Sequence, residues 1–349
     1  MLQFLSSLFA SSEKTAAGVD DALISAATDR VVEGTDSRLR GYGNYRKQLR
    51  DSVETAVVHV IKMINALPSP AEISRSTYSS DPRLRAFFAS FNHLQEKVGG
   101  ARSVSDYIKQ ADYESSSRIY GVLTMEWEEI NRLGTVLQDD MIQREVLQVS
   151  VNFFNHRYLE PSVSLDEARM NVKKRVFDFL VARALEKIIA ERSMRTELEL
   201  QQSLLKRKLA AMKAGNWGLE QMMSQDEHLH TDLASLYAEI EVVETELTKL
   251  GASHKVLERN MQIIKDTLSR PHELLDMHNI SMKLDSMNIR ADESSSGKVN
   301  SLDLIEFYTS TGEKRIVLPG WYPANELPSR RDFVFLMNRG LLSSKYFSW

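Results

Sequence analysis

The sequence predicts an α+β fold that is mostly helical, with an N-terminal helical bundle and an antiparallel β domain that is split by a long inserted antiparallel coiled-coil hairpin. Three observations predict this organisation. An apolar seven-residue repeat without proline runs between residues 229 and 268, a second long helical pattern lies just upstream, and apolar residues alternate with period two on both sides of this pair. A 3.5-residue apolar period is typical of helices that bury one stripe against another helix, whereas period two is typical of strands.

The composition narrows the class of protein. The 349 residues carry 44 Lys and Arg against 48 Asp and Glu, and this net charge of −4 gives no global attraction to nucleic acid or to a membrane surface. The absence of cysteine excludes disulfides, a thiol nucleophile and cysteine-bound metals. Since no run of about 18 apolar residues occurs, the sequence predicts no membrane-spanning helix.

Residues 1–17 are predicted to be an amphipathic, flexible N-terminus. Their apolar side chains would share one helical face and are the candidate membrane-facing residues Leu2, Phe4, Leu5, Leu8 and Phe9. The run lacks the positive charge that precedes a signal-peptide core. Two interpretations stay open: a segment that packs on its own domain or on a second subunit, and a weak interfacial anchor.

Residues 18–112 are predicted to form the helical bundle. A helix from Asn44 to Leu67 is ended by the segment Pro68-Ser69-Pro70. A second helix opens at Pro82, which suits a first helical turn, and closes at Gly99-Gly100. A shorter helical segment follows from Ser103 to Lys109.

Residues 118–160 and 279–349 are predicted to form one split antiparallel β domain. Apolar residues alternate in both segments, and residues 118–156 read as a meander with a middle strand near 133–137. A hairpin turn is expected at residues 310–313, and a short C-terminal helix at 329–339. Because an antiparallel hairpin returns its ends to the same place, both segments are expected to join one sheet.

Residues 164–270, called the arm below, are predicted to form the coiled-coil hairpin, with its turn at 215–218. Ser164 and Glu167 fit a capping box at the start of the first helix. Residues equidistant from Trp217 are then expected to meet, so that Leu205 faces Leu229 and Leu198 faces Leu236. The predicted coiled-coil core is Leu198, Leu205, Leu229, Leu233, Leu236, Ile240, Val243, Leu247, Leu250, His254, Leu257, Met261, Ile264 and Leu268.

Charge supports this pairing of helices. Residues 169–213 contain 12 Lys and Arg against 5 Asp and Glu, whereas residues 219–250 contain 8 Asp and Glu against 1 Lys. Opposite flanking charges select the partner and the orientation of coiled-coil helices. The alternative is pairing of the second helix with its own copy, which its acidic flanks disfavour. His254 would be a polar core residue that fixes register, with a pH switch as the functional alternative.

Several clusters could carry chemistry, and the sequence favours a structural interpretation of most of them. Asp226, His228 and His230 cannot converge as three ligands because residues two apart leave a helix on different sides. His272 and His278 each lie near a carboxylate, but no nucleophile accompanies them. The basic and aromatic segment around Arg38, Arg40, Arg46, Lys47 and Arg50 could contact phosphate, or be a solvated helix start.

The arm tip is the candidate partner-binding site. Lys206, Arg207, Lys213 and Trp217 gather there, and Trp and Arg are enriched at interface hot spots. The structural alternative is that the lysines pair with acidic residues of the second helix.

The predicted function is a non-enzymatic, soluble, cytoplasmic coiled-coil adaptor or structural component of a multi-protein assembly, in which the arm docks or spaces partners. The expected partners are other proteins, with a homo-oligomer as an open alternative; no cofactor or metal is predicted, and nucleic acid is disfavoured. Two rival functions remain: a peripheral membrane protein anchored by residues 2–9, and an enzyme or nucleic-acid-binding factor that carries a coiled-coil arm.

Overall fold

A computed structural model of the 349-residue chain describes residues 20–109, 117–138, 141–213, 227–250, 255–291 and 299–327. The amphipathic N-terminus, the turn at 215–218, His254 and the C-terminal helix at 329–339 lie outside these ranges. The described chain mixes helices with an antiparallel sheet, as the sequence predicts. It divides into two compact units: a sheet unit (Met1–Leu23, Val57–Phe177 and Pro271–Trp349) and a helical unit (Ile24–Ala56 and Asp178–Arg270). The predicted domain boundaries stay a prediction.

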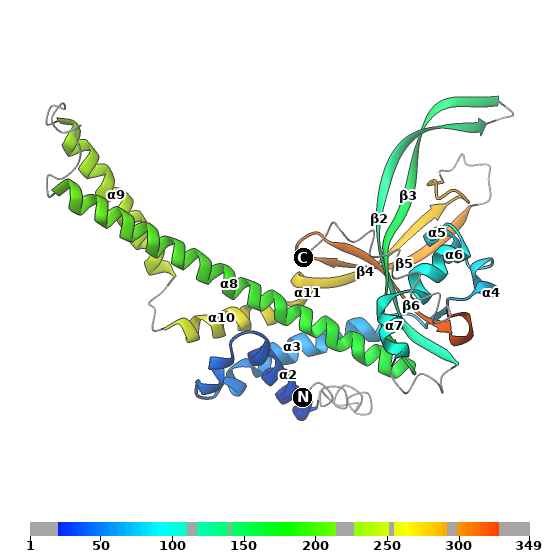
Figure 1. Ribbon diagram of the computed structural model, residues 1–349, viewed down its shortest axis with the longest axis horizontal. Helices are drawn as coiled ribbons and strands as arrows, with labels where there is room; N and C mark the ends of the chain where they lie inside the picture. Colours follow the sequence, from blue (N-terminus) through cyan, green and yellow to red (C-terminus); the bar gives the residue numbers. More distant parts are fainter. Residues whose placement is uncertain are drawn as a thin grey trace. The chain divides into compact units, whose positions relative to one another are not determined.

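The sheet unit is built on strands in the order β3-β2-β6-β5-β4 (Figure 1). Strands β2 (Arg118–Gln138) and β3 (Met141–Ser162) pair with each other, and β4 (Leu275–Leu284), β5 (Asn300–Thr309) and β6 (Lys314–Pro323) come from the later segment. β2 pairs antiparallel with β6, so strands from both halves of the chain share one sheet. The two-residue strand β1 (Ala71–Glu72) adds a parallel pair to β6.

The predicted three-strand meander at 118–156 was wrong. β2 continues through residues 133–137 as one strand, and it pairs with β3 as far as Gln138 and Met141. β2 runs through Gly134, beside which the end of the Gln148 side chain of β3 occupies the space that a Cβ would take. At the β5–β6 connection, Gly312 has a φ of +85°, which suits the predicted hairpin turn.

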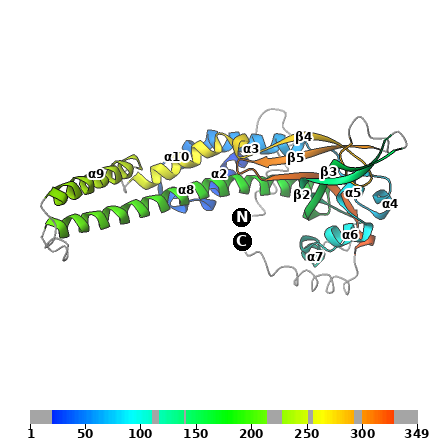
Figure 2. The same ribbon diagram turned by 90° about the horizontal axis from the view of Figure 1, so that it is seen from above.

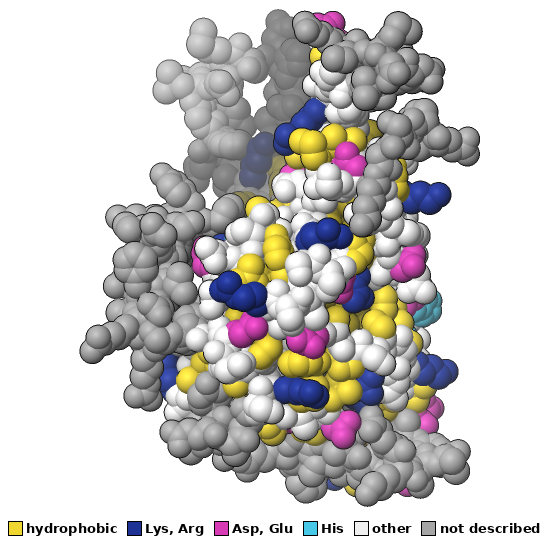
Figure 3. Space-filling model, turned by 90° about the vertical axis from the view of Figure 1, so that its right-hand side faces the viewer, with side chains coloured by type: hydrophobic (Ala, Val, Ile, Leu, Met, Phe, Trp, Pro, Cys, Tyr) yellow, Lys and Arg dark blue, Asp and Glu magenta, His cyan; other side chains and the backbone are white. Residues whose placement is uncertain are grey.

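Short helices pack on one face of this sheet and close its core. They are α4 (Arg75–Tyr78), α5 (Pro82–Phe87), α6 (Phe91–Leu94), the π-helical turn η3 (Gln95–Gly99) and α7 (Arg102–Ile108). Their apolar side chains, including Leu84 and Phe87, join buried residues of β2 to β6 in one cluster. Figure 3 shows apolar, basic and acidic side chains interspersed over a described surface, without a single-sign charged patch in that view.

The single predicted helix from Pro82 to Gly99 was also wrong. Phe88 is extended, with φ −125° and ψ 130°, and it ends α5. Ser90 then caps α6 by accepting a hydrogen bond from the backbone N–H of His93. Two consecutive local caps, Asp81 and Ser90, therefore divide an apolar pattern that reads as one helix.

The helical unit contains most of α2 (Asp21–Gly34), the 3₁₀ turn η2 (Ser37–Gly41) and the first part of α3 (Tyr45–Asn65). It also holds most of α8 (Leu165–Lys213), together with α9 (Glu227–Lys249) and α10 (Val256–Leu268); α11 (Pro271–Leu274) belongs to the sheet unit. Ser164 caps α8 by accepting from the Glu167 N–H at 3.2 Å, as predicted. In Figures 1 and 2, α9 lies alongside the later part of α8.

The expectation of one unbroken helix over 229–268 was wrong. α9 ends at Lys249 and α10 begins at Val256, and Gly251 lies between them in the sequence. Glycine after a helix is a common stop signal, which the sequence offers two residues after the end of α9. Among the helices of the described residues, none is both long and apolar enough to cross a bilayer.

Candidate functional site

The predicted coiled-coil residues lie mainly at helix contacts of the helical unit. Leu236 and Ile240 of α9 form a buried cluster with Leu205 and Leu209 of α8 and with Leu233. The other predicted core residues with described side chains are Val243, Met261, Ile264 and Leu268, which are buried, and Leu198, Leu247, Leu250 and Leu257, which are half-buried. The Leu229 side chain and His254 lie outside the described residues.

The predicted register between the two helices was wrong. Equidistance from Trp217 places Asp232 opposite Gln202, but Gln202 Nε2 instead donates to Glu244 Oε1 at 3.0 Å. Lys206 Nζ lies 2.8 Å from the same carboxylate oxygen. α8 ends at Lys213 whereas α9 begins only at Glu227, so the midpoint between the helices falls later than residue 217.

The candidate docking residues at the arm tip are only partly described. Lys206 pairs with Glu244, as the structural alternative predicts. The Arg207 side chain is exposed. The side chain of Lys213, and Trp217 altogether, fall outside the described residues. The structure therefore leaves the tip hypothesis untested.

The main polar centre of the helical unit is Asp36, which the sequence analysis missed. Its side chain is only 6% exposed and accepts hydrogen bonds from Arg38 Nη2 at 2.7 Å, Arg192 Nη2 at 2.8 Å and Asn260 Nδ2 at 2.7 Å. These donors lie on η2, α8 and α10, so one carboxylate joins three elements. A buried charge is tolerated only when it is paired and hydrogen-bonded. The local signal was Asp36 as a cap, since it also accepts from the Arg38 N–H.

The electrostatics of Asp36 fit a permanent structural anion. The hydrogen bonds from the Arg38 side chain, with further help from Asn260, hold the pKa of this carboxyl at about 2, against the opposing effect of burial. A carboxyl group with such a pKa stays ionised near neutral pH. Asp36 is therefore suited to fixing helices and not to acid–base catalysis.

A cavity of about 330 Å³ lies near Asp36 in the helical unit. Arg192, Arg259 and Lys249 contribute to its lining, together with Glu191 and others. Each of these three cations already has a carboxylate partner: Asp36 for Arg192, Glu191 for Arg259 and Glu246 for Lys249. Arg195 also lines the cavity and pairs with Glu199, whereas Lys255 makes no ion pair among the described residues, so four of the five lining cations are already compensated.

Two cations of the predicted basic patch near residue 40, Arg38 and Arg46, are paired with carboxylates. Arg46 Nη2 lies 2.7 Å from Asp29 Oδ2, and the Tyr45 hydroxyl donates to Asp29 at 2.8 Å. Arg38 is committed to Asp36. These contacts favour the structural alternative, a helix start held by local ion pairs, over a phosphate-binding surface.

The sheet unit holds a buried carboxylate beside one of the predicted histidines. Glu306 of β5 is 1% exposed; its Oε1 accepts from Trp127 Nε1 at 2.5 Å, and its Oε2 lies 3.2 Å from His278 Nε2. His278 is 46% exposed, and its ring centroid lies 5.0 Å from that of Tyr308. The sequence singled out His278 but could not find Glu306 or Trp127, which reach it through strand pairing.

This arrangement orients an imidazole but supplies no further reacting group. A neutral His278 that donates from Nε2 to Glu306 keeps Nδ1 as its proton acceptor. Among the described residues, no hydroxyl or amine is hydrogen-bonded to His278 as a nucleophile would be. His272, the other predicted histidine, is exposed on α11 and does not join this group. The cluster is therefore weak support for catalysis.

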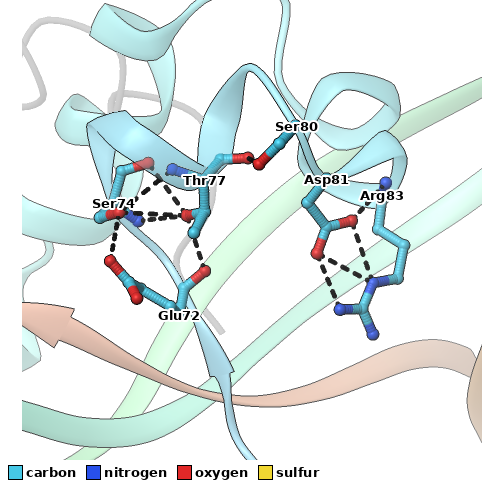
Figure 4. A network of polar contacts seen from close by, with 6 residues as sticks. All are labelled: Glu72, Ser74, Thr77, Ser80, Asp81 and Arg83. Atoms are coloured by element: carbon cyan, nitrogen blue, oxygen red, sulfur yellow. Dashed lines mark hydrogen bonds and ion pairs between the residues drawn. The ribbon is translucent and has the colours of Figure 1, made fainter.

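A second polar network lies at the start of α4 and α5 (Figure 4). Ser74 caps α4 by accepting from the Thr77 N–H, and its hydroxyl donates to Glu72 at 2.7 Å. Asp81 caps α5 and binds the Arg83 guanidinium at 2.7 Å. An open cavity of about 500 Å³ adjoins these residues. Ser74 and Asp81 complete helix caps and Asp81 pairs with Arg83, so these contacts account for the two helix starts without a ligand.

Two histidines meet on the sheet unit without satisfying their ring nitrogens. The rings of His93 and His156 have centroids 5.6 Å apart, and Phe88 contacts both. Nδ1 of His93 and Nε2 of His156 are buried and make no hydrogen bond within the described residues. Burial, with the charges of His93 and Lys97, lowers the pKa of His156 to about 4.

Acidification is expected to destabilise the sheet unit through His156. Its folded-state pKa of about 4 lies below the ordinary 6.5. The stability that neutral His156 contributes is therefore fully present above about pH 6.5 and is lost as the pH falls towards 4. After a discount for partial exposure, we expect a loss of about 1–3 kcal/mol. In urea unfolding between pH 6.5 and 5, His156→Phe should flatten this decline, whereas His272→Gln should keep the wild-type slope. An unchanged slope in His156→Phe would contradict the assignment.

Comparisons with protein-family models, with curated proteins and with solved structures find no match to this chain. Among the described residues, no group of three or more His, Asp or Glu side chains is arranged to hold a metal ion.

Proposed function

We propose that this chain is a non-enzymatic, cytoplasmic adaptor or structural component of a multi-protein assembly. In this proposal α8 and α9 form the antiparallel coiled-coil hairpin that is inserted into the split β domain, and the arm docks or spaces partners. The observation that carries the proposal is the length of α8. It is one helix of 49 residues, which corresponds to a length of about 74 Å.

The order of contacts along α8 supports an antiparallel hairpin. Along α8, Glu191 binds Arg259 of α10. About three turns later, Gln202 and Lys206 bind Glu244 of α9. Later residues of α8 thus meet earlier residues of the returning chain. The apolar cluster of Leu205, Leu209, Leu236 and Ile240 adds the buried stripe that holds such a pair together.

The described sites favour a structural role over catalysis. Asp36 is a fixed anion among three donors, and the Glu72 to Arg83 network completes helix caps. A two-helix element that devotes this much chain to length offers reach to a partner. The Glu306–His278 pair is the best remaining position for an alternative chemical function.

The proposal is tested by shortening the arm without disturbing Asp36. Residues 199–246 are replaced by a short Gly/Ser loop, which leaves Glu191, Arg192 and α10 in place. Proteins retained by the tagged full chain from its native extract are compared with those retained by the shortened chain, after crosslinking. Loss of a specific partner or of self-assembly with the arm supports the proposal. A full chain that neither binds a partner nor self-associates through the arm would overturn it.

A further inference from the structure

α8 carries a second apolar stripe that no described element covers. Ile189 is 53% exposed, Leu200 is 54% exposed and Leu204 is 55% exposed. At 100° per residue, these three side chains fall within about 60° of one another around the helix. Leu198, Leu205 and Leu209, which face α9, fall on roughly the opposite side. The helix therefore has one apolar face for its intramolecular partner and a second face that is open.

Charged residues bracket the open stripe in a self-complementary way. Glu186 lies one turn before Ile189 on the same face, and Arg207 lies one turn after Leu204. Glu186 pairs locally with Arg183 at 2.7 Å, and Arg207 makes no ion pair with a described residue. One end of the stripe is thus acidic and the other basic.

Antiparallel pairing of the stripe with itself satisfies both ends at once. If Ile189 faces Leu204 of a second copy, the same register places Glu186 opposite Arg207 and Ser193 opposite Leu200. The twofold axis then passes close to Thr196 and Glu197. Isologous contacts repeat each pair twice, so one register gives two apolar contacts and two ion pairs.

We propose that the outer face of α8 is a self-association surface, on which two copies of this chain pack antiparallel through Ile189, Leu200 and Leu204. This inference rests on the proposed function and names one partner for the arm: a second copy of the chain. Three apolar side chains per copy form a small interface, so we expect a concentration-dependent dimer with a dissociation constant in the micromolar range or weaker.

Single cysteines can test the pairing directly because the chain has none of its own. Thr196→Cys lies beside the predicted axis and should form a disulfide-linked dimer in mild oxidant. Leu204→Cys faces the distant Ile189 position and should stay monomeric. If Thr196→Cys does not crosslink, the inference is overturned; if Leu204→Cys crosslinks as readily, the copies pair in another orientation and the antiparallel register is wrong.

Surface substitutions then measure the strength of the contact. Leu200→Lys with Leu204→Lys should weaken dimerisation at least about tenfold in sedimentation experiments, because two buried apolar contacts are lost. The matched control is Val242→Lys, which changes an apolar residue of α9 that is 62% exposed and lies off the stripe. Equal effects of the two changes would overturn the inference. All these positions are solvent-exposed, so the variants should keep the wild-type circular dichroism.

Charge changes provide a rescue that a purely structural role would not give. Glu186→Arg should weaken the dimer by placing like charges opposite Arg207, and adding Arg207→Glu should restore it. Glu197→Gln should tighten the dimer about two- to fivefold, since it removes a like-charge contact beside the axis. A double charge reversal that fails to restore association would contradict the register.

The failure of this inference can be told apart from the failure of the proposed function. A full chain that captures another protein through the arm while Thr196→Cys stays monomeric would refute self-association alone. A chain that shows no arm-dependent association of any kind would refute both.

Discussion

Replacing Asp36 by alanine is expected to lower the free energy of unfolding of the helical unit by about 2–4 kcal/mol. The change leaves the buried amide of Asn260, which is 3% exposed, without its acceptor. It also removes the common partner of Arg38 and Arg192, whose side chains are 58% and 48% exposed. Because both guanidiniums can regain water, the expected loss stays below that of a fully buried ion pair.

Thermal unfolding and amide hydrogen exchange check this expectation. Amide hydrogen exchange should accelerate first in α10 and in η2, because Asp36 accepts hydrogen bonds from residues of both elements and of α8. Asp29→Ala is the matched control in the same unit. It removes an ion pair between Asp29 and Arg46, which are 32% and 59% exposed, and should cost at most about 1 kcal/mol. Equal losses in the two variants would contradict the role of Asp36 as a buried centre.

Replacing Gly121 by alanine is expected to destabilise the sheet unit by about 2–4 kcal/mol. A Cβ at this position would lie 2.7 Å from two ring atoms of Tyr158 and 2.8 Å from the carbonyl oxygen of Leu159. The Tyr158 ring cannot move away from the added methyl group, because the residue is buried, at 1% exposed. Its hydroxyl is also held by the carbonyl oxygens of Ile119 at 2.9 Å and Gly320 at 3.2 Å, to which it donates. The strands β2 and β3 must therefore separate.

Gly134→Ala is the control for Gly121→Ala on the same strand. There the nearest atoms belong to the flexible end of Gln148, which can move aside at little cost. Urea unfolding of the two variants should differ by about 2 kcal/mol or more. Similar unfolding midpoints would show that the contact between Gly121 and Tyr158 does not constrain the hairpin.

Features coded by neighbouring residues could be predicted from the sequence. The helix at Tyr45–Asn65, the cap at Ser164 and the hairpin turn at Gly312 each depend on a local signal. The buried faces of α9 and α10 follow from the apolar repeat, since Leu236, Ile240 and Ile264 are all buried. Local pattern and tertiary packing agree at these positions.

Features set by long-range geometry could not be predicted. The register of α8 against α9 depends on where each helix ends, and equidistance from Trp217 assumed that both end symmetrically. The Asp36 centre joins residues 156 and 224 positions away along the chain, and no periodicity signals such a contact. Trp127 meets Glu306 only because β2 and β5 flank the same strand, β6.

The measurement that tests the account most directly is a crosslink by a short bismaleimide between Gln202→Cys and Glu244→Cys in the otherwise cysteine-free full chain. Nε2 of Gln202 and Oε1 of Glu244 meet at 3.0 Å at the ends of two long side chains, so the account predicts that the reagent bridges the two shorter cysteine thiols within one chain, seen as a faster-migrating monomer. Glu197→Cys with Glu244→Cys, which starts from the opposite face of α8, should not form this crosslink. If the first pair crosslinks only between chains, or not at all, α8 and α9 do not form a hairpin within one molecule.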